Sequence, residues 1–106
     1  MDLVESVYHL IQALPSEERF GLADQMRRAA VSIPSNIAEG HARSGDKEFR
    51  NFLHIASGSR AELQTQILIC ERVGLLTRAQ TKPALLLTEE VGKLLHAFIV
   101  SLSKSC

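Results

Sequence analysis

The chain has 106 residues, enough for one domain around a single small hydrophobic core. Hydrophobic residues make up 45% of it and charged residues 23%, a composition that excludes a disordered chain and is typical of a folded domain. The basic and acidic residues balance to a formal net charge of +0, so any nucleic-acid-binding surface must be local. Aromatic residues are only 5% and Trp is absent, which predicts an aliphatic core.

The cysteines and the hydropathy pattern bear on the cellular compartment. Cys70 lies in an apolar helical run and Cys106 ends the chain, so the pair does not indicate a disulfide framework. No charged-then-apolar leader and no long apolar run occurs, which argues against export and membrane insertion. We therefore expect a reduced cytoplasmic protein that does not associate with membranes.

The first predicted helix begins near Asp2, which can cap it, and Pro15 ends it. Its apolar residues recur at helical spacing: Leu3, Val7, Leu10, Ile11 and Leu14. Ser16 can then cap a second helix, with Glu17 and Glu18 in the first turn, where the helix dipole favours negative charge.

The second predicted helix is long and contains Pro34. Its apolar row keeps the same phase on both sides of that proline: Leu22, Met26, Ala30, Ile33 and Ile37. The pattern therefore favours one helix kinked near Pro34. Asn36 and Glu39 have the spacing of a capping box, so a new helix starting there is an alternative. Asn36 itself is expected to act as a structural hydrogen-bonding residue, satisfying a carbonyl freed by Pro34.

The third predicted helix follows Gly45, with Asp46 as its cap. Its expected inner face comprises Phe49, Phe52, Leu53, Ala56, Leu63, Ile67, Cys70 and Val73. Gly58 lies mid-helix among small residues, which indicates a close approach by another helix. The run at 67–70 is apolar on every side of the helix, so part of it is expected to face another subunit.

The fourth predicted helix follows a stop at Gly74 and Leu75, and Thr77 with Gln80 makes a capping box for it. Its expected apolar face comprises Leu86, Val91, Leu94, Leu95, Phe98, Ile99 and Leu102. Four helices with short connections predict an all-α, antiparallel up-down-up-down four-helix bundle in which residues 1–106 form a single domain.

Several sequence words, in order, resemble one known family. They are QMRRAA at 25–30, SIPSNIAEG at 32–40, GS at 58–59 and EL at 62–63, within a likeness that runs from about Val7 to Leu102. The chain resembles the 23S rRNA-intervening sequence proteins, which implies a small bacterial four-helix bundle, in a family where most members have no demonstrated activity. A related branch, the accessory proteins of diversity-generating retroelements, forms homopentamers that bind a reverse transcriptase and nucleic acid. Family members usually carry a further half-helix before the position of Val7. Its absence here implies either a short first helix or an internal recorded start.

No residue pattern predicts a catalytic site, a cofactor or a bound metal. Glu39 and His41 lie two apart, not at the Glu-x-x-His spacing of a di-iron bundle, and the other histidines have no partnered spacing. The acidic pairs Glu17–Glu18 and Glu89–Glu90 are adjacent, so their side chains point to different faces of a helix. We therefore expect a protein that is not an enzyme.

Basic residues give the one candidate binding site, a nucleic-acid-binding patch. The candidates are Arg27, Arg28, Arg43, Lys47 and Arg50. Acidic residues are interleaved among them, so intersubunit or intrabundle ion pairs are the competing interpretation. The homopentamer implied by the resemblance would repeat the patch around a ring.

Two functional hypotheses lead, and an enzyme that no residue pattern reveals is a third. The first is a non-catalytic oligomeric helical scaffold, a homopentamer that associates with RNA or with a nucleic-acid enzyme such as a reverse transcriptase. The alternative is a protein–protein adaptor without nucleic-acid affinity, whose apolar or concave surface docks a partner chain.

Overall fold

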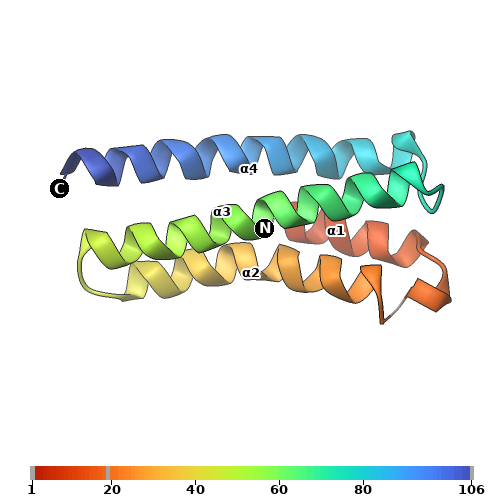
Figure 1. Ribbon diagram of the computed structural model, residues 1–106, viewed down its shortest axis with the longest axis horizontal. Coiled ribbons are helices and arrows are strands. Elements are labelled where there is room, and N and C mark those ends of the chain that lie inside the picture. Colours follow the sequence, from red (N-terminus) through yellow and green to blue (C-terminus); the bar gives the residue numbers. More distant parts are fainter. Residues whose placement is uncertain (1, 19, 106) are drawn as a thin grey trace.

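The computed structural model describes residues 2–18 and 20–105, and these residues contain four α-helices and no strand. The helices are α1 (Asp2–Ala13), α2 (Leu22–Ala42), α3 (Asp46–Arg72) and α4 (Arg78–Ser105), and a single 3-10 turn (Ser16–Glu18) follows α1. Consecutive helices run in opposite directions along the long axis of a 46 × 22 × 19 Å molecule (Figure 1). The expected four-helix bundle is therefore confirmed. None of the described helices is long and apolar enough to span a membrane.

Helix α1 is much shorter than its neighbours. Its 12 residues span about 18 Å, whereas the 21 residues of α2 span about 31 Å. The amino-terminal end of α1 consequently lies near the middle of the bundle's length, and the carboxyl-terminal end of α4 lies at one end (Figure 1). Among the described residues, four helices surround the core in one half of the bundle and three in the other.

The core is aliphatic, as the composition predicts. The largest fully buried apolar side chains come from α1, α2 and α3: Val7, Met26, Leu53, Leu63, Ile67 and Cys70. The Cys70 thiol donates to the Met26 sulfur at 3.7 Å. Cys106, the other cysteine, lies outside the described residues.

Helix α2 continues through Pro34 without interruption, so the alternative of a new helix at Asn36 is wrong. Asn36 Nδ2 donates to the Ser32 carbonyl and to Ser32 Oγ, each at 2.8 Å, and Ser32 Oγ lies 2.8 Å from Ser59 Oγ on α3. Asn36 is thus a structural hydrogen-bonding residue. The carbonyl that it satisfies belongs to Ser32 and not to Ala30, the residue whose helical hydrogen bond a proline at 34 removes. The kink near Pro34 stays a prediction.

Two helix starts differ from those expected. Residues 16–18 form only a 3-10 turn, and α2 begins at Leu22, with Gly21 in the cap position. Helix α3 has Gly45 in its cap position, with φ +100°, and no side chain caps that end, so Asp46 is the first helical residue. A glycine tolerates that positive φ, and it replaces the expected carboxylate cap.

The connection from α3 to α4 follows the sequence closely. The Gly74 amide donates to the Glu71 carbonyl at 3.2 Å and the Leu75 amide to the Cys70 carbonyl at 2.9 Å, which is a Schellman motif. The Thr77 amide donates to Gln80 Oε1 at 2.8 Å, and the Gln80 amide donates to Thr77 Oγ1 at 3.2 Å. The predicted stop and capping box are both confirmed.

The close approach of helices does not occur at Gly58. A Cβ built there would meet no atom within 4 Å, so no helix of this chain packs against it. The close approach occurs at buried Gly40, where a Cβ would lie 2.6 Å from Phe52 Cβ. Ala56, two residues before Gly58, faces the core instead.

The prediction of the inner faces of α3 and α4 is wrong at several positions. Val73 is 63% exposed, Leu94 65% and Phe98 48%, and Leu86 is exposed as well. The most buried residues of α4 are Thr81, Ala84, Thr88 and Leu95. The face of α4 that packs on the core therefore carries smaller side chains than the predicted face. Large apolar side chains therefore remain on the surface of this chain.

Candidate nucleic-acid interface and an open apolar trough

The five basic candidates fall into two groups on α2 and its flanks. Arg27 and Arg28 lie in the amino-terminal half of α2, whereas Arg43 follows the helix and Lys47 and Arg50 lie early in α3. The 15 residues from Arg28 to Arg43 correspond to about 22 Å along a helix. Within one copy of the chain, the candidates do not form one continuous patch.

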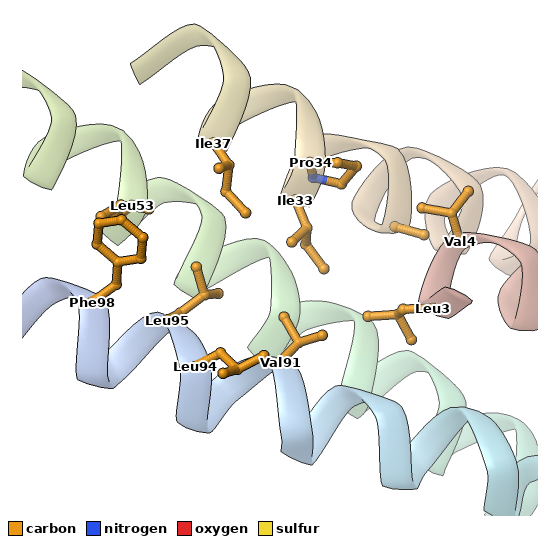
Figure 2. Close-up of a pocket in the computed structure, with 11 residues that line it drawn as sticks. Leu3, Val4, Ile33, Pro34, Ile37, Leu53, Val91, Leu94, Leu95 and Phe98 are labelled. Atoms are coloured by element: carbon orange, nitrogen blue, oxygen red, sulfur yellow. The ribbon is translucent and has the colours of Figure 1, made fainter. Parts of the chain in front are cut away.

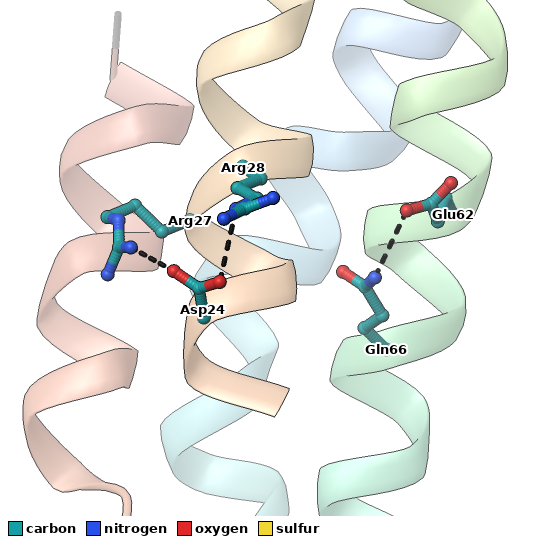
Figure 3. A network of polar contacts seen from close by, with 5 residues as sticks. All are labelled: Asp24, Arg27, Arg28, Glu62 and Gln66. Carbon is teal, nitrogen blue, oxygen red and sulfur yellow. Dashed lines mark hydrogen bonds and ion pairs between the residues drawn. The ribbon is translucent and has the colours of Figure 1, made fainter. Parts of the chain in front are cut away.

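Asp24 holds both arginines of the first group. One carboxylate oxygen accepts a hydrogen bond from Arg27, and the other lies 3.1 Å from Nε of Arg28, one helical turn away (Figure 3). The Arg28 side chain is nevertheless 78% exposed, against 42% for Arg27. Arg27 lines a hollow of about 280 Å³ between the end of α1 and α2. A guanidinium has five N–H donors, so the exposed part of Arg28 retains the means to contact a phosphate.

The second group is also mixed with acidic residues. Nη2 of Arg43 donates to Glu39 Oε1 at 2.7 Å, and its guanidinium lies 5.3 Å from the centre of the Phe52 ring. The hydrogen bond and the charge of Glu39 raise the pKa of Arg43 above its ordinary value. Lys47 is exposed and Arg50 half-buried, and both are close in sequence to the exposed Asp46 and Glu48. Ion pairs inside the bundle therefore account for three of the five candidates.

Two kinds of chemical group bear on possible reactivity in the described part of the chain: clusters of metal ligands and the Cys70 thiol. No set of three His, Cys, Asp or Glu side chains there could hold a metal ion. Burial raises the pKa of the Cys70 thiol, which makes it a poor nucleophile at neutral pH.

Sequence reasoning missed an apolar hollow beyond the amino-terminal end of α1, which we call the α2–α4 trough. Its volume is about 290 Å³. It is lined by Leu3 and Val4 of α1, Ala30, Ile33, Pro34 and Ile37 of α2, Leu53 of α3, and Val91, Leu94, Leu95 and Phe98 of α4. Figure 2 shows α2 and α4 on its two sides, α3 behind it and the start of α1 at one end.

Two sequence signals could have indicated the trough. Leu87, Val91, Leu94 and Phe98 form a second apolar row on the fourth helix, at spacings of four, three and four, beside the row that faces the core. The first predicted helix, between Asp2 and Pro15, is also shorter than the second. Together these signals describe an apolar face that α1 covers only in part.

Comparisons with known proteins agree with this architecture. The family model described as 23S rRNA-intervening sequence protein matches residues 1–97, which confirms the resemblance stated above. The fold is similar to the crystal structure of a protein of unknown function from the S23 ribosomal protein family of Bacteroides thetaiotaomicron, with TM-score 0.85, 26% identity and 92% of each chain covered. No curated protein matches the sequence.

Proposed function

Because this chain belongs to the 23S rRNA-intervening sequence protein family, we propose that it is a non-catalytic, cytoplasmic, oligomeric scaffold that associates with RNA or with a nucleic-acid enzyme. The observation that carries the proposal is the apolar surface that the bundle leaves uncovered. The exposed large apolar side chains on α3, directly after it and on α4 are Ile55, Leu68, Ile69, Val73, Leu86, Leu94, Phe98 and Val100. Apolar surface gathered on two helices of a small bundle is typical of a protein that binds other chains.

Self-association is the first part of the proposal, with a homopentamer as the expected form. Ile69 lies two residues after the buried Ile67, which places it about 200° around α3 and on the outer side of the bundle. The substitution Ile69→Glu would put a charge into a subunit interface there, so it should reduce the oligomer mass measured by light scattering. Gln25→Glu, at an exposed position of α2, is the control that should leave the mass unchanged.

Association with RNA is the second part, and the exposed Arg28 supports it. A ring of copies would repeat the Arg27–Arg28 pair and so build a larger basic surface than one chain offers. Gel shifts with ribosomal RNA fragments should show binding that weakens steeply as salt rises, because phosphate contacts release counterions. Arg28→Ala should weaken binding more than Arg78→Ala, an exposed arginine at the start of α4. Binding that ignores both salt and Arg28→Ala would contradict the phosphate role.

Asp24 offers a second test of the same role. Its carboxylate competes with phosphate for both arginines. If these arginines contact RNA, Asp24→Asn should strengthen binding, because the competing charge is removed. If they serve only the bundle, the substitution should leave RNA affinity unchanged and lower the free energy of unfolding.

The alternative function is a protein–protein adaptor without nucleic-acid affinity. The pairing of Arg27 and Arg28 with Asp24, and of Arg43 with Glu39, favours it, since these charges are already balanced within the chain. No gel shift at low salt, together with saturable binding of a protein partner, would select this function over the first.

A further inference from the structure

Among the described residues, the most exposed large apolar side chain is Phe20, in the turn between α1 and α2. It is 90% exposed, although Leu14 before it and Ala23 after it are buried in the core. The Gly21 amide donates to the Glu18 carbonyl at 3.1 Å, which closes a tight turn around Phe20. The turn therefore presents an aromatic side chain that the bundle does not cover, on a backbone fixed by a hydrogen bond.

A hollow on α4, which we call the α4 hollow, has the size that an aromatic ring requires. Its volume is about 260 Å³, and Leu85 and Leu86 are its apolar lining. An apolar cavity of about 150 Å³ is enough to hold a benzene molecule. Leu86 is 56% exposed, so its side chain is available to contact a ring from outside the bundle.

The turn and the α4 hollow lie on different sides of the bundle but at the same end. Helices α2 and α4 each pack on α1 and α3, and their described residues do not pack on each other. Figure 1 shows the connection before α2 and the start of α4 at the same end of the molecule. Two different surfaces at one height allow copies to stand side by side, and such contacts generate a ring when the rotation between copies closes.

The charges around the two surfaces are complementary. Residues 16–21 contain two carboxylates and one guanidinium, a formal charge of −1, and Glu17 among them is exposed. The α4 hollow has the opposite balance, a formal charge of +1 from Arg78, Lys82 and Glu89. Opposite charges at the rims favour this pairing over contacts between like surfaces. The negative charge of the turn also disfavours RNA as the group that covers Phe20.

We propose that Phe20 of one copy inserts into the α4 hollow of a second copy, against Leu85 and Leu86, with Glu17 beside Arg78 and Lys82. This inference rests on the proposed oligomeric scaffold and names the contact that joins its copies. Each copy offers its turn to one neighbour and its hollow to another. Neither surface includes the start of α1 or the α2–α4 trough.

Light scattering on two variants tests the two surfaces separately. Phe20→Ala removes the ring, and Leu86→Glu places a carboxylate in the hollow. Each should lower the oligomer mass towards 11.7 kDa, because burial of a phenylalanine side chain corresponds to about 10- to 100-fold in a dissociation constant. Circular dichroism melting checks that both variants are folded.

Matched controls carry the same kinds of substitution elsewhere. Tyr8→Ala removes another exposed aromatic side chain, on α1. Ala97→Glu adds the same charge on the same side of α4, 11 residues after Leu86 and about 17 Å further along the helix. Both controls should leave the oligomer mass unchanged.

Mixing the two interface variants distinguishes a contact between different surfaces from one between like surfaces. Phe20→Ala retains an intact hollow, and Leu86→Glu retains an intact Phe20. An equimolar mixture should therefore form a 1:1 dimer of about twice the 11.7 kDa chain mass, which neither variant forms alone. A mixture that stays monomeric, beside an unmodified chain that is oligomeric, would overturn the inference.

The unmodified chain separates failure of this inference from failure of the scaffold proposal. If it is an oligomer whose mass neither substitution changes, the scaffold stands and the Phe20 contact is wrong. If it is a monomer at micromolar concentration, both are wrong. An unchanged mass for Phe20→Ala together with a weaker gel shift would assign the turn to RNA and would also overturn the inference.

Discussion

The two halves of the bundle differ in how many helices surround the core, although apolar residues recur with the same spacing in both. Where α1 is present, Val7, Met26 and Ile67 are all 0% exposed. Beyond the amino-terminal end of α1, the side chains of Leu94 and Phe98 on α4 are 65% and 48% exposed and border an open trough. Ile33 and Leu95 also border the trough and stay buried, whereas the neighbouring α4 row with Leu94 and Phe98 lies on the surface. Periodicity tells which face of a helix is apolar, and the neighbouring helices decide whether that face is buried.

The largest expected difference between the two halves is in how much the free energy of unfolding falls when a large side chain is truncated. Met26→Ala in the covered half should lower the free energy of unfolding by about 2–5 kcal/mol, because it leaves a cavity among buried neighbours. Leu94→Ala in the open half should cost clearly less, since solvent already reaches that side chain. Urea unfolding of both variants gives the comparison. Equal losses would mean that the trough is closed in solution.

Substitutions at Gly40, near the end of α2, and at Gly58, in the middle of α3, are expected to change stability in opposite directions. Gly40→Ala should destabilise the bundle by about 1–3 kcal/mol, because the new Cβ would lie 2.6 Å from Phe52 Cβ. A lowered midpoint of thermal unfolding is the readout. An unchanged midpoint would show that α2 and α3 can separate there at little cost.

Gly58→Ala should have the opposite sign. The position is exposed and a Cβ meets nothing within 4 Å, so alanine should stabilise α3 by up to about 1 kcal/mol. Gly58→Leu should likewise leave the fold of a single chain intact, and a smaller oligomer for that variant would place Gly58 at a subunit contact. A large loss of stability in dilute, monomeric samples would contradict the open environment of this residue.

The smallest expected effects concern helix caps. Thr77→Ala should cost about 1 kcal/mol, because the hydroxyl that accepts from the Gln80 amide is lost. Asp46→Ala should cost less, since no side-chain hydrogen bond caps the start of α3. Thermal unfolding of the two variants compares a cap that forms with one that does not. The reverse order would show that Asp46 caps α3 in solution.

Local features were well predicted from the sequence where neighbouring residues alone determine them. The capping box at Thr77 and Gln80 and the glycine stop at Gly74 depend on contacts a few residues apart. The passage of α2 through Pro34 followed from an apolar row that keeps its phase. These features need no knowledge of the other helices.

Features that depend on distant residues were predicted poorly. Gly58 was assigned a helix contact that Gly40 makes, because composition marks a small residue without showing which way it faces. Val73 and Phe98 were assigned to the core because they belong to apolar rows. In the structure, Val73 is 63% exposed and Phe98 48%. The ion pairs of Arg28 with Asp24 and of Arg43 with Glu39 are local by contrast, and intrabundle ion pairs were the competing interpretation of the basic residues.

Light scattering of the unmodified chain beside Ile69→Glu tests the central claim, that the uncovered apolar surface of this bundle binds other chains. The account predicts an oligomer, expected to be a pentamer, for the unmodified chain at micromolar concentration, and a smaller particle for the variant. A monomer of 11.7 kDa in both samples would contradict it.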